Sequence, residues 1–378
     1  MNSYKISDIK YKRILGRTAP LENEKPLVLF WASSALELNV KSSEVHLLIS
    51  SDYERNEPWV SIYINGYPIS RFVVEKGEAK WVCIARNLNV EKENLITIYK
   101  DTQPMPDDNP HSLFIHEVKL SEKGTFLPLN PRKLKIEFIG DSITSGEGLA
   151  GGKDAWDWIP QFFVGSSTYA AQTARRLNAD FSVVSQSGWG ICWGWDGNRN
   201  TKIPPFYEQV CGVSRSNIQK SLGSQEAYDF KGGSDYVVVN LGTNDNGAFY
   251  QPPWQQEEFK DKYKLDYNTD DETVSEKDSE IIIDGVKDFL KIIRRNNPKA
   301  IIIWCWGMIK LKLVPPLIQI GVEEYMFESG DEKVYTLELD SMGDVEILDE
   351  EKGSRGHPGP KTHRLAAIKL SDFIKNPC

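Results

Sequence analysis

The hydrophobic pattern changes near residues 125–133, and this change divides the chain into two parts with different secondary structure. Before it, from about residue 26 to 120, we expect short strands at PLVLFWA, EVHLLISSD, WVSIYING, YPISRFVVE, AKWVCIAR, NLITIYKD and LFIHEVKL. Short strands at this spacing are typical of a β-sandwich. The segment TFLPLNPRK contains two prolines and has no periodicity, which favours a domain boundary there. The sequence therefore predicts a β-sandwich over residues 1–128 and a second domain over 129–378.

The second part alternates strands with helices. We expect strands at LKIEFIG, DFSVVSQSG, SDYVVVNLG and KAIIIWCWG, and helices over residues 167–177, 281–295 and 360–374. This alternation predicts an α/β domain, a parallel sheet with helices on both faces. Ligands bind such sheets at the carboxyl ends of the strands. Three of these ends carry polar or glycine-rich turns, namely GDS, SGWG and GTND.

Charge and composition exclude several classes of partner. The net charge is −9 and no run of five Lys or Arg residues occurs, which argues against nucleic acid or an anionic membrane as the partner. The acidic stretch Asp270–Asp278 lacks the spacing of a calcium-binding loop, so we expect no metal and no cofactor. The five cysteines are scattered without CxxC spacing. With no signal-peptide pattern at the N-terminus, this predicts reduced thiols and a cytoplasmic location. A mature form whose leader has been removed is the alternative.

Ser142 follows the strand LKIEFIG within the turn GDSIT, where it is either a simple turn residue or a nucleophile. A nucleophilic serine needs a base, and the chain has five histidines. His46, His111 and His116 belong to the predicted sandwich. His357 precedes a proline on a loop, from which its ring can reach a sheet end, whereas we expect His363 to be a solvated residue in the first turn of the last helix. His357 is therefore the candidate base.

An ester-cleaving serine also needs donors for the oxyanion that develops on the carbonyl. Asn244 directly follows the strand SDYVVVNLG, so its side-chain amide can point into the same crevice as Ser142. Gly188 ends another strand, and a glycine lets a backbone N–H approach a ligand closely. Gly190 is an alternative to Gly188, because SGWG offers two glycines. We expect the oxyanion hole to consist of the N–H groups of Ser142 and Gly188 and the amide of Asn244.

These four blocks resemble those of the SGNH (GDSL-like) hydrolases over residues 133–378. In that family the serine lies in GDS, the glycine after the second strand, the asparagine in GxND and the histidine in a C-terminal DxxH. The matching residues here are Ser142, Gly188, Asn244 and His357. Ser142 does not lie in the GxSxG turn of another hydrolase class, because the segment around it reads GDSIT.

One position departs from the family pattern. The aspartate that orients the histidine is replaced by Ser354. An N-terminal sandwich combined with this missing acid resembles carbohydrate esterase family two, whose members are acetylesterases of plant cell-wall glycans. The resemblance implies a jelly-roll-like sandwich and a Ser–His dyad with main-chain carbonyls holding the imidazole Nδ1–H. Asp349, Glu350 or Glu351 remains an alternative source of the acid.

Tryptophans are concentrated in the second part, which contains eight of the eleven in the chain. Aromatic faces around a polar crevice suit sugar rings better than lipid chains. Trp156, Trp158 and Trp195 are candidate lining residues, and our predicted substrate contacts are Trp189, Trp193, Trp306 and Asp245.

The sequence thus predicts a serine esterase that removes O-acetyl groups from mannan- or xylan-type oligosaccharides. A lipid esterase or thioesterase on the same scaffold, or a glycan-binding protein without activity, is the alternative.

Overall fold

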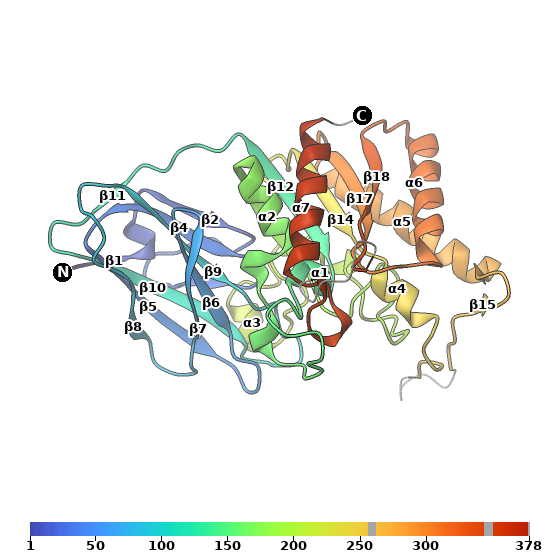
Figure 1. Ribbon diagram of the computed structural model, residues 1–378, viewed down its shortest axis with the longest axis horizontal. Helices are drawn as coiled ribbons and strands as arrows, with labels where there is room; N and C mark the ends of the chain where they lie inside the picture. The colour runs from blue at the N-terminus through green and yellow to red at the C-terminus, as the bar shows by residue number, and fades with distance from the viewer. Residues whose placement is uncertain (256–261, 344–350, 377–378) are drawn as a thin grey trace.

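The structure is a computed structural model, and it describes residues 1–255, 262–343 and 351–376. It contains an antiparallel β-sandwich and an α/β domain that lie side by side (Figure 1). β11 ends the sandwich at Leu127 and β12 begins the parallel sheet at Leu134. Within the described ranges, no helix combines the length and the apolar character that crossing a membrane requires.

The sandwich consists of two antiparallel sheets that enclose an aliphatic core. The first contains β1 (Asn2–Lys5), β10 (Ser112–Leu120), β5 (Glu44–Asp52) and β8 (Lys80–Arg86), with β3 (Leu27–Leu29) also paired to β10. The second contains β11 (Thr125–Leu127), β4 (Ala35–Lys41), β9 (Asn94–Lys100), β6 (Trp59–Ile64) and β7 (Tyr67–Val73), with β2 (Lys12–Leu15) paired to β4. β1, β2, β4 and β11 were not predicted from the sequence, although Leu36, Leu38 and Val40 alternate along β4 and are fully buried.

The α/β domain has a parallel sheet, as predicted, and this sheet contains five strands. Its strand order is β13 (Ala179–Ser185), β12 (Leu134–Gly140), β14 (Tyr236–Asn240), β17 (Ile301–Gly307) and β18 (Val334–Leu339). β12 is the first of the five strands in the chain but lies between β13 and β14. The connection from β12 to β13 and the connection from β13 to β14 therefore run in opposite directions along the sheet. This reversal opens a crevice at the carboxyl ends of β12 and β14, where such folds bind ligands.

Helices cover both faces of this sheet, as expected. One face packs against α2 (Tyr169–Leu177) and α7 (Pro360–Lys375), and the other against α5 (Glu276–Asn296) and α6 (Val314–Ser329). Short pieces complete the domain: α1 (Ser142–Ser145), α3 (Asn217–Ser221), α4 (Thr243–Ala248) and the hairpin of β15 (Tyr267–Asn268) with β16 (Thr273–Val274). α6 and β18 were not predicted from the sequence. Apolar residues lie on buried and exposed sides of α6, including exposed Phe327, so its pattern lacks a clear helical period.

A buried ion pair joins the two domains. Arg17, which follows β2, is fully buried, and its Nε and Nη2 donate to Glu137 Oε1 of β12 at 3.0 and 2.9 Å. Its Nη1 donates to the carbonyl oxygens of Tyr207 and Gln209. The guanidinium also lies 4.3 Å from the ring centroid of Tyr228. Each guanidinium nitrogen therefore has a partner, which offsets the cost of removing the charges from water.

Hydrophobic contacts extend this interface. The indole of Trp31, in the sandwich, is fully buried and its Nε1 donates to Val210 O at 2.7 Å. Phe30 and Trp31 pack in the same cluster as the residues beneath α5 and α6. On the other face of the sheet, Tyr63 and Tyr99 of the sandwich join the cluster beneath α2 and α7. Side chains of the sandwich therefore contribute to both hydrophobic clusters of the α/β domain.

We expect Arg17→Met to lower the free energy of unfolding by about 3–5 kcal/mol, because it leaves the buried Glu137 carboxylate without a counter-charge. Guanidinium denaturation followed by circular dichroism measures this change. The control is Lys5→Met, which removes an exposed pair with Glu24 and is expected to change stability by less than about 0.5 kcal/mol. Equal effects of the two substitutions would contradict the role given to Arg17.

Candidate active site

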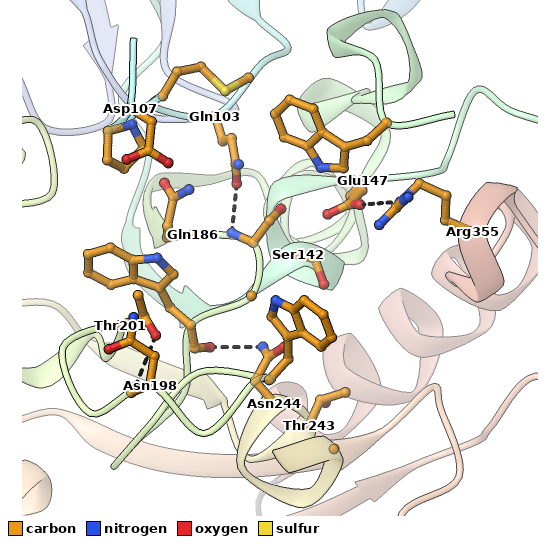
Figure 2. A pocket seen from close by; sticks show the side chains of 18 of the residues that line it. Gln103, Asp107, Ser142, Glu147, Gln186, Asn198, Thr201, Thr243, Asn244 and Arg355 are labelled. Atoms are coloured by element: carbon orange, nitrogen blue, oxygen red, sulfur yellow. Dashed lines mark hydrogen bonds and ion pairs between the residues drawn. The ribbon is translucent and has the colours of Figure 1, made fainter. Parts of the chain in front are cut away.

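A cavity of about 1050 Å³ lies at the carboxyl ends of β12 and β14, where both domains contribute to its wall (Figure 2). The α/β domain supplies Ser142, Glu147, Gly188, Trp189, Asn244 and His357, and the sandwich supplies Arg55, Asn56, Gln103, Met105, Pro106 and Asp107. The structure thus brings together the four residues that the sequence analysis selected from segments far apart in the chain.

Ser142 is the first residue of α1, directly after β12. The Asp141 side chain caps this short helix by accepting the Ile143 N–H at 3.0 Å. A Cβ at Gly140 would lie only 2.0 Å from Thr144 Oγ1, so only glycine fits this tight turn. Because Ser142 opens the helix, its own N–H has no carbonyl partner within α1. The turn therefore presents both a hydroxyl and a backbone donor to the cavity.

Asn244 lies in α4, after β14, and its position is fixed by two acceptors. Its Nδ2 lies 2.9 Å from Trp189 O and 3.3 Å from Asp141 Oδ2. The Asp141 carboxyl therefore contacts both the serine turn and the asparagine amide. Burial raises the pKa of Asp141 to about 7. This fully buried carboxyl sets the relative positions of Ser142 and Asn244.

Gly188 lines the cavity, whereas its alternative, Gly190, does not line the wall formed by the described residues. Gly188 has a φ of +79°, and a Cβ there would lie 3.0 Å from the Trp195 indole. The N–H of Gly190 donates to Thr201 O at 3.3 Å. A Cβ on Gly190 would lie 2.3 Å from the Asp245 carboxylate. Of the two glycines, Gly188 is the one beside Ser142 and Asn244.

His357 lies between a 3₁₀ turn (Ser354–Gly356) and α7. Its backbone holds it on both sides, because its N–H donates to Ser354 O at 3.1 Å and its carbonyl accepts the Gly353 N–H at 2.8 Å. The buried Nδ1 has no hydrogen-bond partner in the part of the chain that the structure describes. The main-chain acceptor expected for Nδ1 is therefore not found there.

Three carboxylates were alternative candidates for the acid that orients His357, and one of them is described by the structure. Asp349 and Glu350 lie outside the described residues. Glu351 is described, and its carboxylate binds Lys361 Nζ at 2.7 Å and the Gly343 N–H at 3.3 Å. The hydrogen bond from Lys361 lowers the pKa of Glu351. Glu351 is thus engaged by Lys361 and by the loop before it.

A carboxylate that was not predicted from the sequence, Glu147, lies beside His357. Its Oε2 lies 3.8 Å from His357 Nε2, and its Oε1 accepts from Arg355 Nε at 3.2 Å (Figure 2). Arg355 also donates to Trp156 O at 3.0 Å, which ties the loop after α1 to the histidine segment. Glu147 is five residues after Ser142 in GDSITSGEG. The signal in the sequence that could have indicated Glu147 was a charged residue within a glycine-rich turn.

Three of the four predicted substrate contacts do not line the cavity wall formed by the described residues. Asp245 is fully buried and accepts the N–H groups of Ile191 and Cys192, both at 2.8 Å. Burial raises its pKa to about 6. The buried indole of Trp193 packs on Phe249, and Trp306 packs against the core beneath α5 and α6.

Trp189 does line the cavity, and its backbone carbonyl holds Asn244. Trp158 and Trp195 line it as well, and they are 38 % and 55 % exposed. Exposed indole faces therefore flank the serine turn, although Trp193, which we predicted as a contact, belongs to the core and Trp306 packs against it.

The prediction that His363 is solvated is wrong. Its side chain is fully buried, and its Nδ1 accepts the Tyr169 N–H at 3.0 Å. Burial lowers its pKa from 6.5 to about 3. The N-terminal turn of α7 faces α2 rather than water. The residues next to His363 in the sequence do not reveal which side of this turn is buried. His363 is a structural acceptor at the start of α2.

Comparison with known proteins agrees with this architecture. Residues 138–336 match the GDSL-like Lipase/Acylhydrolase family. The chain is 28% identical over 356 residues to the cellulase/esterase CelE of Acetivibrio thermocellus, covering 92% of this chain and 37% of CelE. The chain therefore spans about a third of the length of that relative.

Among the solved structures that resemble the whole chain are two carbohydrate esterases. An acetyl xylan esterase, Est2A, from the rumen bacterium Butyrivibrio proteoclasticus has 36% identity and a TM-score of 0.93, with 100% of this chain and 99% of that one covered. A family two carbohydrate esterase from Clostridium thermocellum, solved with cellohexaose, has 25% identity and a TM-score of 0.76, with 97% and 98% covered. Both domains of this chain therefore have counterparts in carbohydrate esterases.

The buried state of His363 predicts a pH dependence of stability. Its pKa is about 6.5 unfolded and about 3 folded, so the stability present above pH 6.5 is lost as the pH falls toward 3, because the unfolded chain binds the proton first. The variant His363→Asn keeps an acceptor for the Tyr169 N–H. Between pH 7 and pH 5 we expect its free energy of unfolding to fall by about 2 kcal/mol less than that of the wild type. Urea denaturation at several pH values measures this. Parallel stability curves would contradict the prediction.

Proposed function

This chain belongs to the GDSL-like lipase/acylhydrolase family, and we propose that it is a serine carbohydrate esterase that removes O-acetyl groups from plant cell-wall oligosaccharides. One observation carries the proposal: a single cavity contains the Ser142 turn, the Asn244 amide and the His357 ring. A nucleophile, a base and an oxyanion donor are the three elements that acyl transfer requires.

In the proposed reaction Ser142 Oγ attacks the acetyl carbonyl while His357 accepts the hydroxyl proton. The oxyanion of the tetrahedral intermediate accepts hydrogen bonds from the N–H groups of Ser142 and Gly188 and from the amide of Asn244, which donates to it in place of Asp141 Oδ2, the more distant of its two acceptors. His357 then returns the proton to the departing sugar oxygen, which leaves an acetyl-serine. Water attacks this ester in the same way, and acetate and the free serine are released.

We propose a Ser–His dyad, without a conventional third acid. The position of the usual aspartate is Ser354, and the Glu351 carboxylate is bound to Lys361. The backbone bonds on both sides of His357 hold its main chain in place, and its Nδ1 has no partner among the described residues. When His357 becomes an imidazolium, Glu147 at 3.8 Å from Nε2 attracts the charge. Arg355, on the other oxygen of Glu147, reduces this attraction.

The wall of the cavity favours a sugar over an acyl chain. Around the serine turn it presents Asp107, Gln186 and Asn198 together with the exposed indoles of Trp158 and Trp195. Hydroxyl groups pair with such side chains, and sugar C–H faces stack on indoles. Because Est2A, the 36% identical structure, is named as an acetyl xylan esterase, we propose acetylated xylan fragments as substrates, with mannan-type fragments as the second choice.

Product analysis tests the substrate. We expect mass spectrometry to detect the loss of acetyl groups from acetylated xylan oligosaccharides, and nitrophenyl acetate to be hydrolysed much faster than nitrophenyl octanoate. Preference for the octanoate would favour a lipid esterase, and faster release of acetate from glucomannan would favour mannan. Binding of oligosaccharide without any turnover would favour a glycan-binding protein.

Ser142→Ala should abolish ester turnover in a folded protein, with a loss on the order of 10⁴-fold or more in kcat, because the nucleophile and the base act as one unit. Turnover of nitrophenyl acetate and the circular dichroism spectrum measure the two properties. Ser145, whose hydroxyl bonds Ser185 Oγ at 2.8 Å, provides the control: Ser145→Ala is expected to retain activity. Wild-type activity in folded Ser142→Ala would overturn the proposed mechanism.

Asn244→Ala should lower kcat by about 10²- to 10³-fold with little change in KM, because the amide binds charge that develops in the transition state. Initial rates over a range of acetylated substrate concentrations separate the two constants. If KM rises while kcat is unchanged, Asn244 is a ground-state sugar contact instead.

A further inference from the structure

Gln103 connects the sandwich to the catalytic centre. It follows β9, is only 1 % exposed and lines the cavity. Its Oε1 accepts the backbone N–H of Ser187 at 2.8 Å (Figure 2). Ser187 directly precedes Gly188, whose N–H we assign to the oxyanion hole. A side chain of the sandwich thus holds the residue next to a proposed oxyanion donor.

The turn that carries Gly188 is held at the carbonyl groups of Gly188 and Trp189, which accept from the Trp195 N–H at 3.0 Å and from Asn244 Nδ2 at 2.9 Å. It follows β13, and the N–H of Gln186 donates to Gly140 O at 3.3 Å. The next backbone bond within the turn runs from the Trp189 N–H to Gln186 O, also at 3.3 Å. Across the described ranges, Ser187 N–H has Gln103 as its hydrogen-bond acceptor. Between Gln186 and Trp189, the shortest of these bonds is therefore the one from the sandwich.

Gln103 is itself held rigidly. Its carbonyl accepts from the fully buried Lys100 Nζ at 3.0 Å. The Lys100 backbone is paired with Ser33 and Ser34, since Ser33 N–H donates to Lys100 O and Lys100 N–H donates to Ser34 O, both at 2.8 Å. The adjacent Asp101 carboxylate accepts the Ser166 N–H of the α/β domain at 3.0 Å. The backbone before Gln103 is therefore part of the domain interface.

We infer that Gln103 is a positioning residue for the oxyanion hole: its Oε1 holds the Ser187 N–H and thereby fixes the direction of the Gly188 N–H. This inference rests on the proposed function, because it assumes that Gly188 donates to the oxyanion. A misplacement of about 1 Å in such a donor costs up to about 10²-fold in rate. The sandwich is then required for turnover as well as for folding.

The test compares side chains of equal length. We expect Gln103→Met, which keeps the volume but removes the acceptor, to lower kcat on nitrophenyl acetate about 10- to 100-fold with KM unchanged. Gln103→Glu retains an oxygen for the Ser187 N–H and is expected to recover part of the lost kcat. Should Gln103→Met not fold, Gln103→Asn withdraws the oxygen by one methylene and is expected to show the same loss in kcat.

A matched control separates positioning from stability. Ser33→Ala removes another interdomain bond, from Ser33 Oγ to Gly165 O at 2.7 Å, at a residue that does not line the cavity formed by the described residues. We expect it to lower the Tm as Gln103→Met does, with kcat unchanged. An equal loss of kcat in both variants would reduce Gln103 to a structural role and overturn the inference.

Three other outcomes also overturn the inference: kcat within about threefold of wild type in folded Gln103→Met, a rise in KM at constant kcat, or no recovery in Gln103→Glu. These failures are distinct from failure of the proposed function. If Ser142→Ala and Asn244→Ala lose activity while Gln103→Met retains it, only the role of Gln103 is wrong. If Ser142→Ala remains active, the proposed function itself is wrong.

Discussion

The buried ion pair between Arg17 and Glu137 is the interaction on which the two-domain arrangement depends. Glu137 belongs to β12, the strand that also carries the serine turn, and its carboxylate also accepts from Ser182 Oγ on β13 at 2.9 Å. Removing both charges from water is costly, and the cost is offset only while every donor and acceptor stays paired. This requirement favours one relative placement of the sandwich and the sheet.

The composition of the cavity follows from that placement. Because the sandwich is fixed against β12 and β13, its segments around Arg55 and Gln103 form part of the wall opposite the serine turn. Three N–H groups of residues 54–56 donate to the buried Asp108 carboxylate, so the loop that carries Arg55 is rigid. The active site of this esterase fold is therefore a property of both domains.

Residues of one type take different roles according to their surroundings. His357 lies in the cavity, whereas His363, six residues later, is fully buried and accepts the Tyr169 N–H. Asp245, the neighbour of Asn244, was predicted to contact substrate, but the helical turn of α4 directs its carboxylate to the Ile191 and Cys192 N–H groups. Adjacent residues on a helix face different directions, so neighbourhood in sequence did not indicate a shared role.

The sequence alone determined the α/β class, the sandwich before it and the candidate residues Ser142, Gly188, Asn244 and His357, because alternating apolar runs and turn residues at strand ends are local patterns. It also missed β4 and α6. Only the tertiary structure decided which carboxylate lies near His357, because Glu147 comes from the serine turn and not from the histidine segment. It alone brought Gln103 to Ser187. These contacts join residues 84 and 210 positions apart, and such distances are set by packing between elements, which no local pattern encodes.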